Sequence, residues 1–213
     1  MHDLTISQGY LLCSLGDKGT ISSLRAEVQV GLVASGVMDL LLEGCGTLQQ
    51  KKFDVAGPLP GRLEPLSSLY EFLQEKPRIL EDIASEYNFS FTDRRYNQLL
   101  QDLGRSLVTM GLAEERQGGL WGNKTCYLPD PQGRDQVIQS LRAELLEAGE
   151  LSDEAAALAV LLAKTGQLGQ YFSKYERGAI KARIKELKHT SNNKIVQEMV
   201  DYITALVVVI AVC

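Results

Sequence analysis

The sequence predicts a mainly α-helical protein, a single-domain helical bundle around a buried central helix, with a projecting β-hairpin. The central helix is an apolar stretch from about Ser23 to Glu43, whose last two-thirds carry no charges except Asp39 and Glu43, so no wide polar stripe remains for water. Small residues within it allow close approach of a neighbouring helix: Gly31, Ala34, Ser35 and Gly36. With 213 residues, 45% of them hydrophobic, and no long linker, one domain over residues 1–213 is expected.

Glycines and prolines divide the first half of the chain into short elements. A helix is predicted over residues 7–15, before the central helix, and a strand is predicted after the helix stop at Gly44 and Gly46. Residues 53–65 contain Pro58, Pro60 and Gly61 and are predicted to be irregular surface. Two modest helices should follow, over residues 66–74 and 79–87.

The second half of the chain is predicted to be helical apart from one hairpin. Thr92 fits the N-cap of a helix over residues 93–110 with apolar residues at the helical period, namely Leu99, Leu103, Leu107 and Met110. Residues 112–128 are typical of a hairpin with its turn at 117–119. The remaining predicted helices cover residues 134–148, 153–164 with Ser152 as N-cap, 174–188, and 194–213 after a break at 189–193.

The predicted hairpin carries the single tryptophan of the chain near its tip. Leu120 and Trp121 form a large apolar pair among glycines. Such a pair either folds back onto the core or is offered to a partner or a membrane interface. Both interpretations stay open at the level of sequence.

A basic segment stands out in a protein whose net charge is −5. Its basic side chains recur at spacings of three and four: Lys174, Arg177, Lys181, Lys185 and Lys188. This spacing places them along one face of a helix. The face is either simply solvated or in contact with an acidic surface such as anionic lipid headgroups.

No residue pattern indicates a catalytic, metal or cofactor site, so we expect a protein that is not an enzyme and has no cofactor. The sequence lacks phosphate-loop, dinucleotide, nucleophile-elbow and zinc-protease motifs, and its four cysteines and two histidines are scattered. The N-terminus has no secretory signal pattern, and the apolar run 203–213 is shorter than a spanning helix. A cytoplasmic protein, at most peripheral at a membrane, is therefore expected.

A winged-helix nucleic-acid binder has a similar order of elements and is the least favoured alternative. The helix over residues 93–110 would be its recognition helix and the hairpin its wing. That helix carries two acidic side chains among its charges, which are Asp93, Arg94, Arg95, Asp102 and Arg105. The segment around it is acidic, so we expect no binding to nucleic acid.

Several motifs in a fixed order resemble the Golgi phosphoprotein 3-like family. They are LTISQGYLLCSLGDKG, MDLLLEGCGTL, LGRSLVTMGLAEE, ALAVLLAK and KYERGAIKARIKEL, and the resemblance extends from about Leu4 to the C-terminus. It implies a single, mainly helical, non-enzymatic domain with a projecting hairpin. Eukaryotic members bind phosphatidylinositol 4-phosphate and help retain glycosyltransferases. Because the domain begins almost at Met1, the chain looks like the tail-less members of bacterial type, without a coat-adaptor role.

The resemblance also implies where a lipid pocket would lie. The family uses a tryptophan and an arginine of the central helix region, and two arginines three apart on the helix before the hairpin. These positions fall at Leu24, Val33, Asn97 and Leu100, where none of the four side chains is kept. Neighbouring arginines are the candidate substitutes for headgroup binding: Arg25, Arg94, Arg95 and Arg105.

The leading hypothesis is a non-enzymatic peripheral membrane protein that binds phosphatidylinositol 4-phosphate-like or other anionic phospholipid headgroups. The pocket would lie near Arg25 and Arg94, with Leu120, Trp121 and the basic face over residues 174–188 as further contacts. A protein-interaction module, in which the hairpin forms a homo-oligomer or docks a partner, is the alternative. The DNA-binding interpretation comes third.

Overall fold

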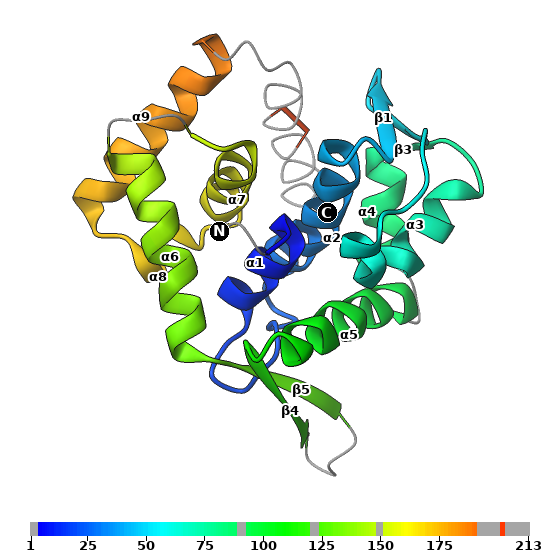
Figure 1. Cartoon of the computed structure of the whole chain (residues 1–213), viewed down its shortest axis with the longest axis horizontal. Helices are drawn as coiled ribbons and strands as arrows, with labels where there is room; N and C mark the ends of the chain where they lie inside the picture. The colour runs from blue at the N-terminus through cyan, green and yellow to red at the C-terminus, as the bar shows by residue number, and fades with distance from the viewer. Residues whose placement is uncertain (1–3, 89–92, 120–123, 148–150, 191–200, 203–213) are drawn as a thin grey trace.

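Two helices occupy the centre of the molecule, and other helices pack on both sides of them (Figure 1). A computed structural model describes residues 4–88, 93–119, 124–147, 151–190 and 201–202, with side chains in the last long helix described as far as residue 186. The central pair is α1 (Ile6–Ser14) and α2 (Ala26–Leu42). The prediction of a mainly α-helical fold with a hairpin is confirmed.

The elements on one side of the central pair are short and come from the middle of the chain. They are β1 (Gly46–Gln49), β2 (Lys52–Val55), the 3₁₀ helix η1 (Gly61–Leu66), α3 (Ser67–Gln74), β3 (Arg78–Ile79), α4 (Leu80–Asn88) and α5 (Arg94–Thr109). Helices α6 (Pro131–Leu146), α7 (Asp153–Lys164), α8 (Leu168–Tyr171) and α9 (Lys174–Thr190) lie on the other side. Strands β4 (Ala113–Gly118) and β5 (Lys124–Pro129) connect the two groups and project from the body.

Helix α2 is buried along most of its length, as predicted, and its glycines are contact points. A side chain added at Gly31 would overlap the Tyr10 hydroxyl and lie 2.9 Å from Thr165 Cγ2. At Gly36 the added atom would lie 2.8 Å from Leu69 Cδ2. The small residues therefore let α1 and α3 pack directly on α2. The helix begins at Ala26 instead of Ser23, because Arg25 has a non-helical backbone (φ −115°, ψ 66°).

The carboxylate of Asp39 on α2 forms hydrogen bonds with the N-terminal end of α1. Thr5 caps α1 in a capping box with Gln8. The carboxylate of Asp39, which is 4% exposed, accepts hydrogen bonds from the backbone N–H groups of Ile6 (2.7 Å) and Ser7 (2.9 Å) and from the Ser7 hydroxyl (2.5 Å). Two backbone donors that no intrahelical acceptor can satisfy are thus paired, with a negative charge at the positive end of the helix.

The burial of Asp39 predicts a pH dependence of stability. Burial raises the pKa of this carboxyl from its ordinary value of 3.8 to about 6. The folded protein then holds the proton more tightly than the unfolded chain, so the free energy of unfolding should fall as the pH rises from about 4 to about 6. Urea denaturation of the wild type and of Asp39→Asn across this pH range should show that the difference between their free energies of unfolding varies with pH. A constant difference would contradict the raised pKa.

One prediction for the middle of the chain was wrong. Residues 53–65 are not wholly irregular: β2 pairs with β1 and β3 in an antiparallel sheet, and η1 contains Pro65. Phe53 is fully buried, with its ring against Gly46 of β1. The tight turn between β1 and β2 uses Gln50 (φ 50°) and Lys51 (φ 64°). Such turns normally carry glycine or asparagine, so Gln50 and Lys51 did not indicate a turn.

The predicted hairpin is confirmed, and its strands run further than expected. Strand β4 pairs with β5 from Ala113↔Pro129 to Gly118↔Lys124. Gln117 and Gly118, which were predicted to lie in the turn, are therefore part of the ladder. Leu120 and Trp121, the predicted partner or membrane contacts, lie outside the described residues.

In the C-terminal half of the chain, capping residues determine where helices begin. Helix α6 begins at Pro131, before the predicted 134, because the Asp130 side chain accepts a hydrogen bond from Gly133 N (2.7 Å). Ser152 caps α7 as predicted. Helix α9 includes residues 189–190, where a break was predicted, and of the predicted helix 194–213 only residues 201–202, which are helical, are described. In the described part of the chain, no helix combines the length and apolar composition that a membrane crossing requires.

Candidate functional site

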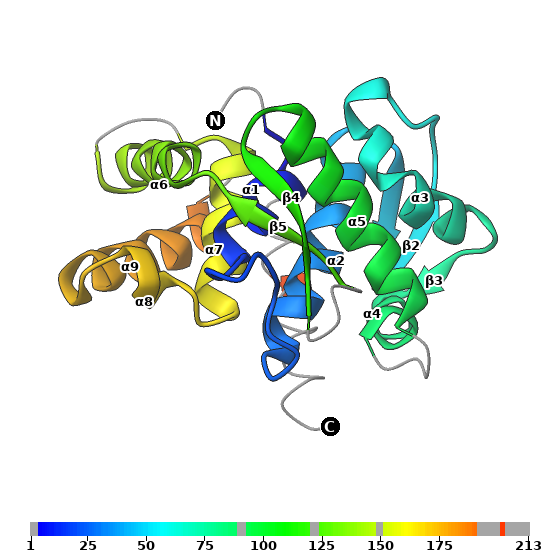
Figure 2. The same cartoon turned by 90° about the horizontal axis from the view of Figure 1, so that it is seen from below.

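A polar cleft lies between the loop before α2, the N-terminal half of α5 and the hairpin. We call it the hairpin cleft; its volume is about 550 Å³. Figure 2 shows the hairpin alongside α5 and the loop that precedes α2. The side chains that line the cleft are Thr20, Ile21, Ser23, Gln29, Tyr87, Asn88, Asp93, Tyr96, Asn97, Leu100, Gln101, Lys124, Thr125 and Tyr127.

Tyr127 holds the three walls of the hairpin cleft together. Its backbone N–H donates to Gly19 O (2.8 Å), which ties the loop before α2 to β5. Its ring packs where Gly104 of α5 has no side chain, since an added atom there would overlap the ring. Gly19 itself has φ +68° and lies against the Tyr127 backbone, so both glycines are required for this close packing.

The lining of the hairpin cleft is rich in groups that can both donate and accept hydrogen bonds. Among the lining residues the charged ones are Asp93 and Lys124. In the described part of the chain, the side-chain amides of Gln29, Asn97 and Gln101 form no hydrogen bond with another protein group. These amides are therefore available to a ligand or to solvent.

Two polar atoms in the walls of the cleft are buried without a partner. The Tyr96 hydroxyl and the Asn88 Oδ1 accept or donate no hydrogen bond within the described structure. Tyr96 is 6% exposed, and burial raises the pKa of its hydroxyl above the ordinary range. A buried polar atom without a partner costs about 1–3 kcal/mol, so either atom would gain from a polar group that reached it.

The structure brings together part of the implied lipid pocket. Asn97 and Leu100 both line the hairpin cleft. Leu24 follows the lining residue Ser23 and is 93% exposed, an unusual position for leucine. Val33 is 1% exposed in the core of α2 and is not part of the lining. Three of the four positions thus lie in the cleft or next to it.

The candidate arginines do not line the hairpin cleft. Arg25 donates to Thr165 O (2.9 Å) and pairs with Glu27 (3.0 Å), which joins the start of α2 to the end of α7. Arg25 and Arg94 were predicted to lie at one pocket, and the structure does not bring them together. Arg94 lies one turn before Asn97, yet it opens onto a different cavity, lined by α3 and α4.

Arg95 and Arg105 also lie outside the lining of the hairpin cleft. The Arg95 guanidinium lies 4.4 Å from the centre of the Phe72 ring and 3.9 Å from Glu86. Arg105 borders a larger groove between α5 and the η1–α3 segment, with a volume of about 770 Å³. Of the four arginines, the structure brings only Arg94 and Arg95 to a common cavity.

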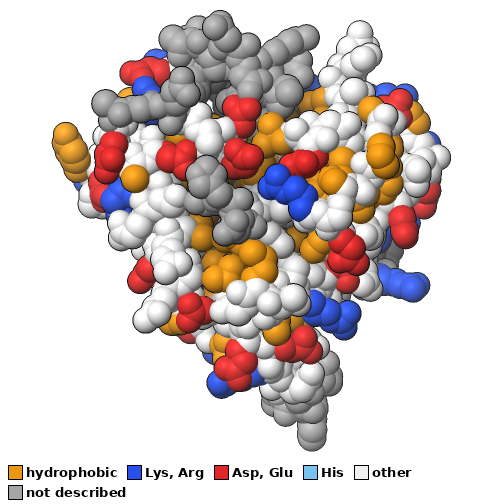
Figure 3. Space-filling model, viewed as in Figure 1, with side chains coloured by type: hydrophobic (Ala, Val, Ile, Leu, Met, Phe, Trp, Pro, Cys, Tyr) orange, Lys and Arg blue, Asp and Glu red, His pale blue; other side chains and the backbone are white. Residues whose placement is uncertain are grey.

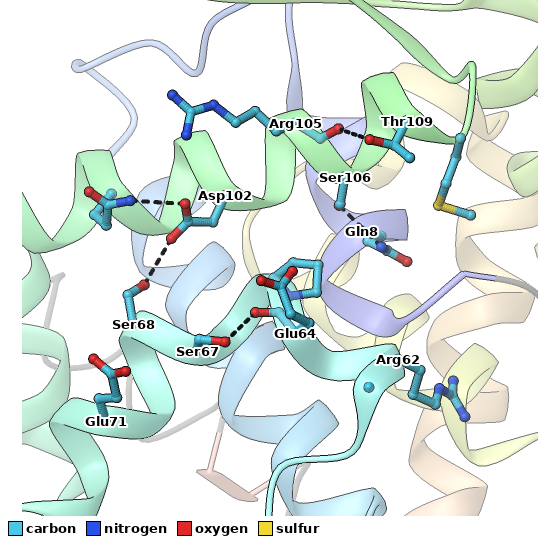
Figure 4. Close-up of a pocket in the computed structure, with 14 residues that line it drawn as sticks. Gln8, Arg62, Glu64, Ser67, Ser68, Glu71, Asp102, Arg105, Ser106 and Thr109 are labelled. Carbon is cyan, nitrogen blue, oxygen red and sulfur yellow. Dashed lines mark hydrogen bonds between the residues drawn. The ribbon is translucent and has the colours of Figure 1, made fainter.

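The larger groove is shown in Figure 4 and has mixed charge. Asp102 accepts hydrogen bonds from the Ser68 hydroxyl (3.2 Å) and the Gln98 amide (2.9 Å). Gln8 reaches the groove from α1 and donates to Ser106 Oγ (3.1 Å). This groove was not predicted from the sequence, because its two walls come from segments about forty residues apart that no shared motif connects.

Helix α9 has the predicted amphipathic character. Ile180 and Ile184 are buried, whereas Lys174, Lys181 and Lys185 are exposed. Tyr175, which is 87% exposed, projects beside these lysines. Lys188 lies outside the described side chains. On the face seen in Figure 3, acidic and basic side chains are interspersed among the described residues.

The described residues contain no group of three His, Cys, Asp or Glu side chains that could hold a metal ion. The fold and the cleft define a class of protein: a mainly α-helical domain with a projecting hairpin beside a polar, ligand-sized cleft. The sequence model of the Golgi phosphoprotein 3 (GPP34) family matches residues 7–204, and the chain belongs to this family. Among curated proteins, no sequence matches the chain.

Proposed function

We propose that this protein is a non-enzymatic, peripheral membrane protein that binds anionic phospholipid headgroups in the hairpin cleft. The observation that carries the proposal is that Asn97 and Leu100 line one cleft and that the exposed Leu24 follows a residue of the same lining. These are positions at which the resemblance to the family implies a lipid pocket. Family membership supports the same location, although the family's phosphate-binding side chains are absent.

The exposed Leu24 supports contact with a membrane. Transfer of a leucine side chain out of water contributes about 1.5–3 kcal/mol. Leu24 is next to a lining residue of the cleft, so a headgroup bound in the cleft would bring this side chain to the lipid surface. Basic residues add about 1 kcal/mol each near an anionic surface, and Lys124 lies in the cleft itself. Binding is expected to be weak and sensitive to salt.

The hairpin gives no support to nucleic-acid binding. On β4, Arg116 forms an ion pair with Glu114 (2.8 Å), and Glu115 follows Glu114 on the same strand. This strand therefore offers no net positive charge to phosphates. The proposed partner is lipid, and no nucleic acid is expected.

Liposome flotation tests the proposal. Vesicles of phosphatidylcholine alone, with phosphatidylinositol 4-phosphate, or with another anionic phospholipid are mixed with the protein. Both anionic vesicles should carry the protein upward, and Leu24→Asp should weaken this binding about tenfold or more, because the apolar contact is lost. Equal lack of binding to all three vesicles would contradict the proposal.

Tyr175→Asp is the matched control for this experiment. Tyr175 is another exposed large side chain, but it lies on α9 and not at the cleft. The control variant should bind as the wild type does. If Tyr175→Asp abolishes binding and Leu24→Asp does not, the basic helix is the membrane contact and the cleft is not.

A further inference from the structure

The charges of the hairpin cleft are poorly suited to a phosphomonoester. A phosphomonoester carries up to two negative charges and is bound best by bidentate guanidinium groups. Among the described residues that line the cleft there is no arginine, and the charged side chains, Lys124 and Asp93, are of opposite sign. The nearest arginine along α5, Arg94, opens onto the cavity on the other side of the helix. Charge therefore does not explain what this cleft would select.

The hydrogen-bonding groups of the cleft fit a polyol instead. Each hydroxyl of a polyol can donate one hydrogen bond and accept another, as each side-chain amide can. The amides of Gln29, Asn97 and Gln101 are without protein partners in the described part of the chain, and Asp93 adds an acceptor. Neutral side-chain amides, which both donate and accept hydrogen bonds, can therefore pair with the neighbouring hydroxyls of a polyol.

The buried atoms point in the same direction. Asn88 uses its amide nitrogen to donate to Ala84 O (3.0 Å), which leaves its Oδ1 as an acceptor without a donor. The Tyr96 hydroxyl likewise has no partner among the described residues. Both atoms are closed to solvent, so a ligand hydroxyl reaches them only after a shift of the wall; it then donates to Asn88 Oδ1 and pairs with Tyr96 in either direction. A fully ionised phosphate oxygen, which only accepts, could not donate to Asn88.

We propose that the hairpin cleft recognises the hydroxyl groups of an unphosphorylated polyol headgroup, such as the inositol or glycerol headgroup of an anionic phospholipid. This inference rests on the proposed function and names the headgroup class that the same cleft takes. The volume of about 550 Å³ is within the usual range for small-molecule sites, about 300–1,000 Å³. The diester phosphate that joins headgroup and lipid stays at the mouth, near Lys124.

The test compares vesicles of matched surface charge. They contain phosphatidylinositol, phosphatidylglycerol, phosphatidylserine or phosphatidylinositol 4-phosphate in phosphatidylcholine. The two polyol lipids should bind about fivefold or more tightly than phosphatidylserine, the factor that one net hydrogen bond of ~1 kcal/mol gives. Equal binding to all anionic vesicles would overturn the inference and leave the proposed function intact. A preference of the wild type for phosphatidylinositol 4-phosphate over phosphatidylinositol would also overturn it.

Variants of α5 separate the cleft from its surroundings. Asn97→Leu and Gln101→Leu should lose the preference for polyol lipids and keep the residual charge-dependent binding to phosphatidylserine. Gln98→Leu is the matched control, because Gln98 is adjacent to Asn97 but faces the larger groove and bonds Asp102. Asn97→Arg should raise the affinity for phosphatidylinositol 4-phosphate more than that for phosphatidylinositol. Retention of the polyol preference by Asn97→Leu and Gln101→Leu would overturn the assignment of the cleft.

Soluble glycerophosphoinositol separates a lipid-bound headgroup from a free polyol. If the inference and the proposed function are both right, this compound competes with phosphatidylinositol vesicles. If it binds the protein while no vesicle does, the cleft takes a free polyol and the membrane proposal fails. If neither it nor the polyol vesicles bind, the inference fails.

Discussion

Replacing Asp39 with alanine is expected to lower the free energy of unfolding by about 3 kcal/mol. The substitution leaves the backbone N–H groups of Ile6 and Ser7, and the Ser7 hydroxyl, without an acceptor in the protein interior. Each buried donor that loses its partner costs about 1–3 kcal/mol. Helix α1 packs on α2, α5 and α7, so the loss should be felt by the whole fold. Urea denaturation at neutral pH measures it.

Asp39→Asn is the control for this prediction. Its carbonyl oxygen still accepts one of the hydrogen bonds, and the buried charge is removed. The loss in stability should therefore be smaller than for alanine. If Asp39→Ala unfolds at the same urea concentration as the wild type, Asp39 does not hold the start of α1.

Replacing Gly31 with alanine is expected to lower the free energy of unfolding by about 1–2 kcal/mol, the overpacking cost less the gain in helix propensity. Alanine is normally the better helix former by ~1 kcal/mol. Here its methyl group would overlap the Tyr10 hydroxyl and crowd Thr165 Cγ2 at 2.9 Å. Tyr10 and Thr165 are both fully buried, so neither can move into solvent, and overpacking of this kind costs about 1–3 kcal/mol. Thermal or urea unfolding provides the measurement.

Gly178→Ala is the matched control, because Gly178 is also helical but nothing lies within 4 Å of the added atom. That variant should be more stable than the wild type by ~0.5–1 kcal/mol. Combining Gly31→Ala with Tyr10→Phe removes one overlapping atom, so the double variant should lose less stability than the sum of the single variants. Strict additivity, or a neutral Gly31→Ala, would contradict close packing of α1 on α2.

The scaffold and the hairpin cleft depend on the same packing. Helix α1 is fixed by Asp39, and α5 packs on α1 while its Gly104 receives the ring of Tyr127. Tyr127 in turn holds the loop that carries Ser23 and Leu24. The walls of the cleft are therefore set by the buried core and not by contacts within the cleft. Within the described residues, the lining amides of Gln29, Asn97 and Gln101 have no protein partner.

Much of the secondary structure could be predicted because its signals are local. The buried central helix with its small residues, the Ser152 cap and the hairpin before α6 were each predicted from a few neighbouring residues. The family, too, was indicated by the order of short motifs and is confirmed over residues 7–204. The β1–β2 turn was not predicted, because Gln50 and Lys51 adopt positive φ angles that are usually found at glycine.

The site was less accessible to prediction than the fold. Asn97 and Leu100 were located by resemblance, and they do line one cleft. The arginines nearby in sequence were chosen as substitutes, yet Arg25 is engaged with Thr165 and Arg94 faces another cavity. Which cavity an arginine faces depends on the side of the helix that carries it and on the partners that other helices supply. Neither can be read from residue spacing alone.

The sequence by itself determined the helical class, the central helix and the family, since periodicity, capping and motif order act within a few turns of chain. Only the tertiary structure decided the roles of the charged and polar side chains. Asp39 binds the start of α1 across 33 residues, and Arg25 reaches Thr165 across 140. A polar group is defined by the partner it meets, and folding brings these partners together from segments that share no local signal.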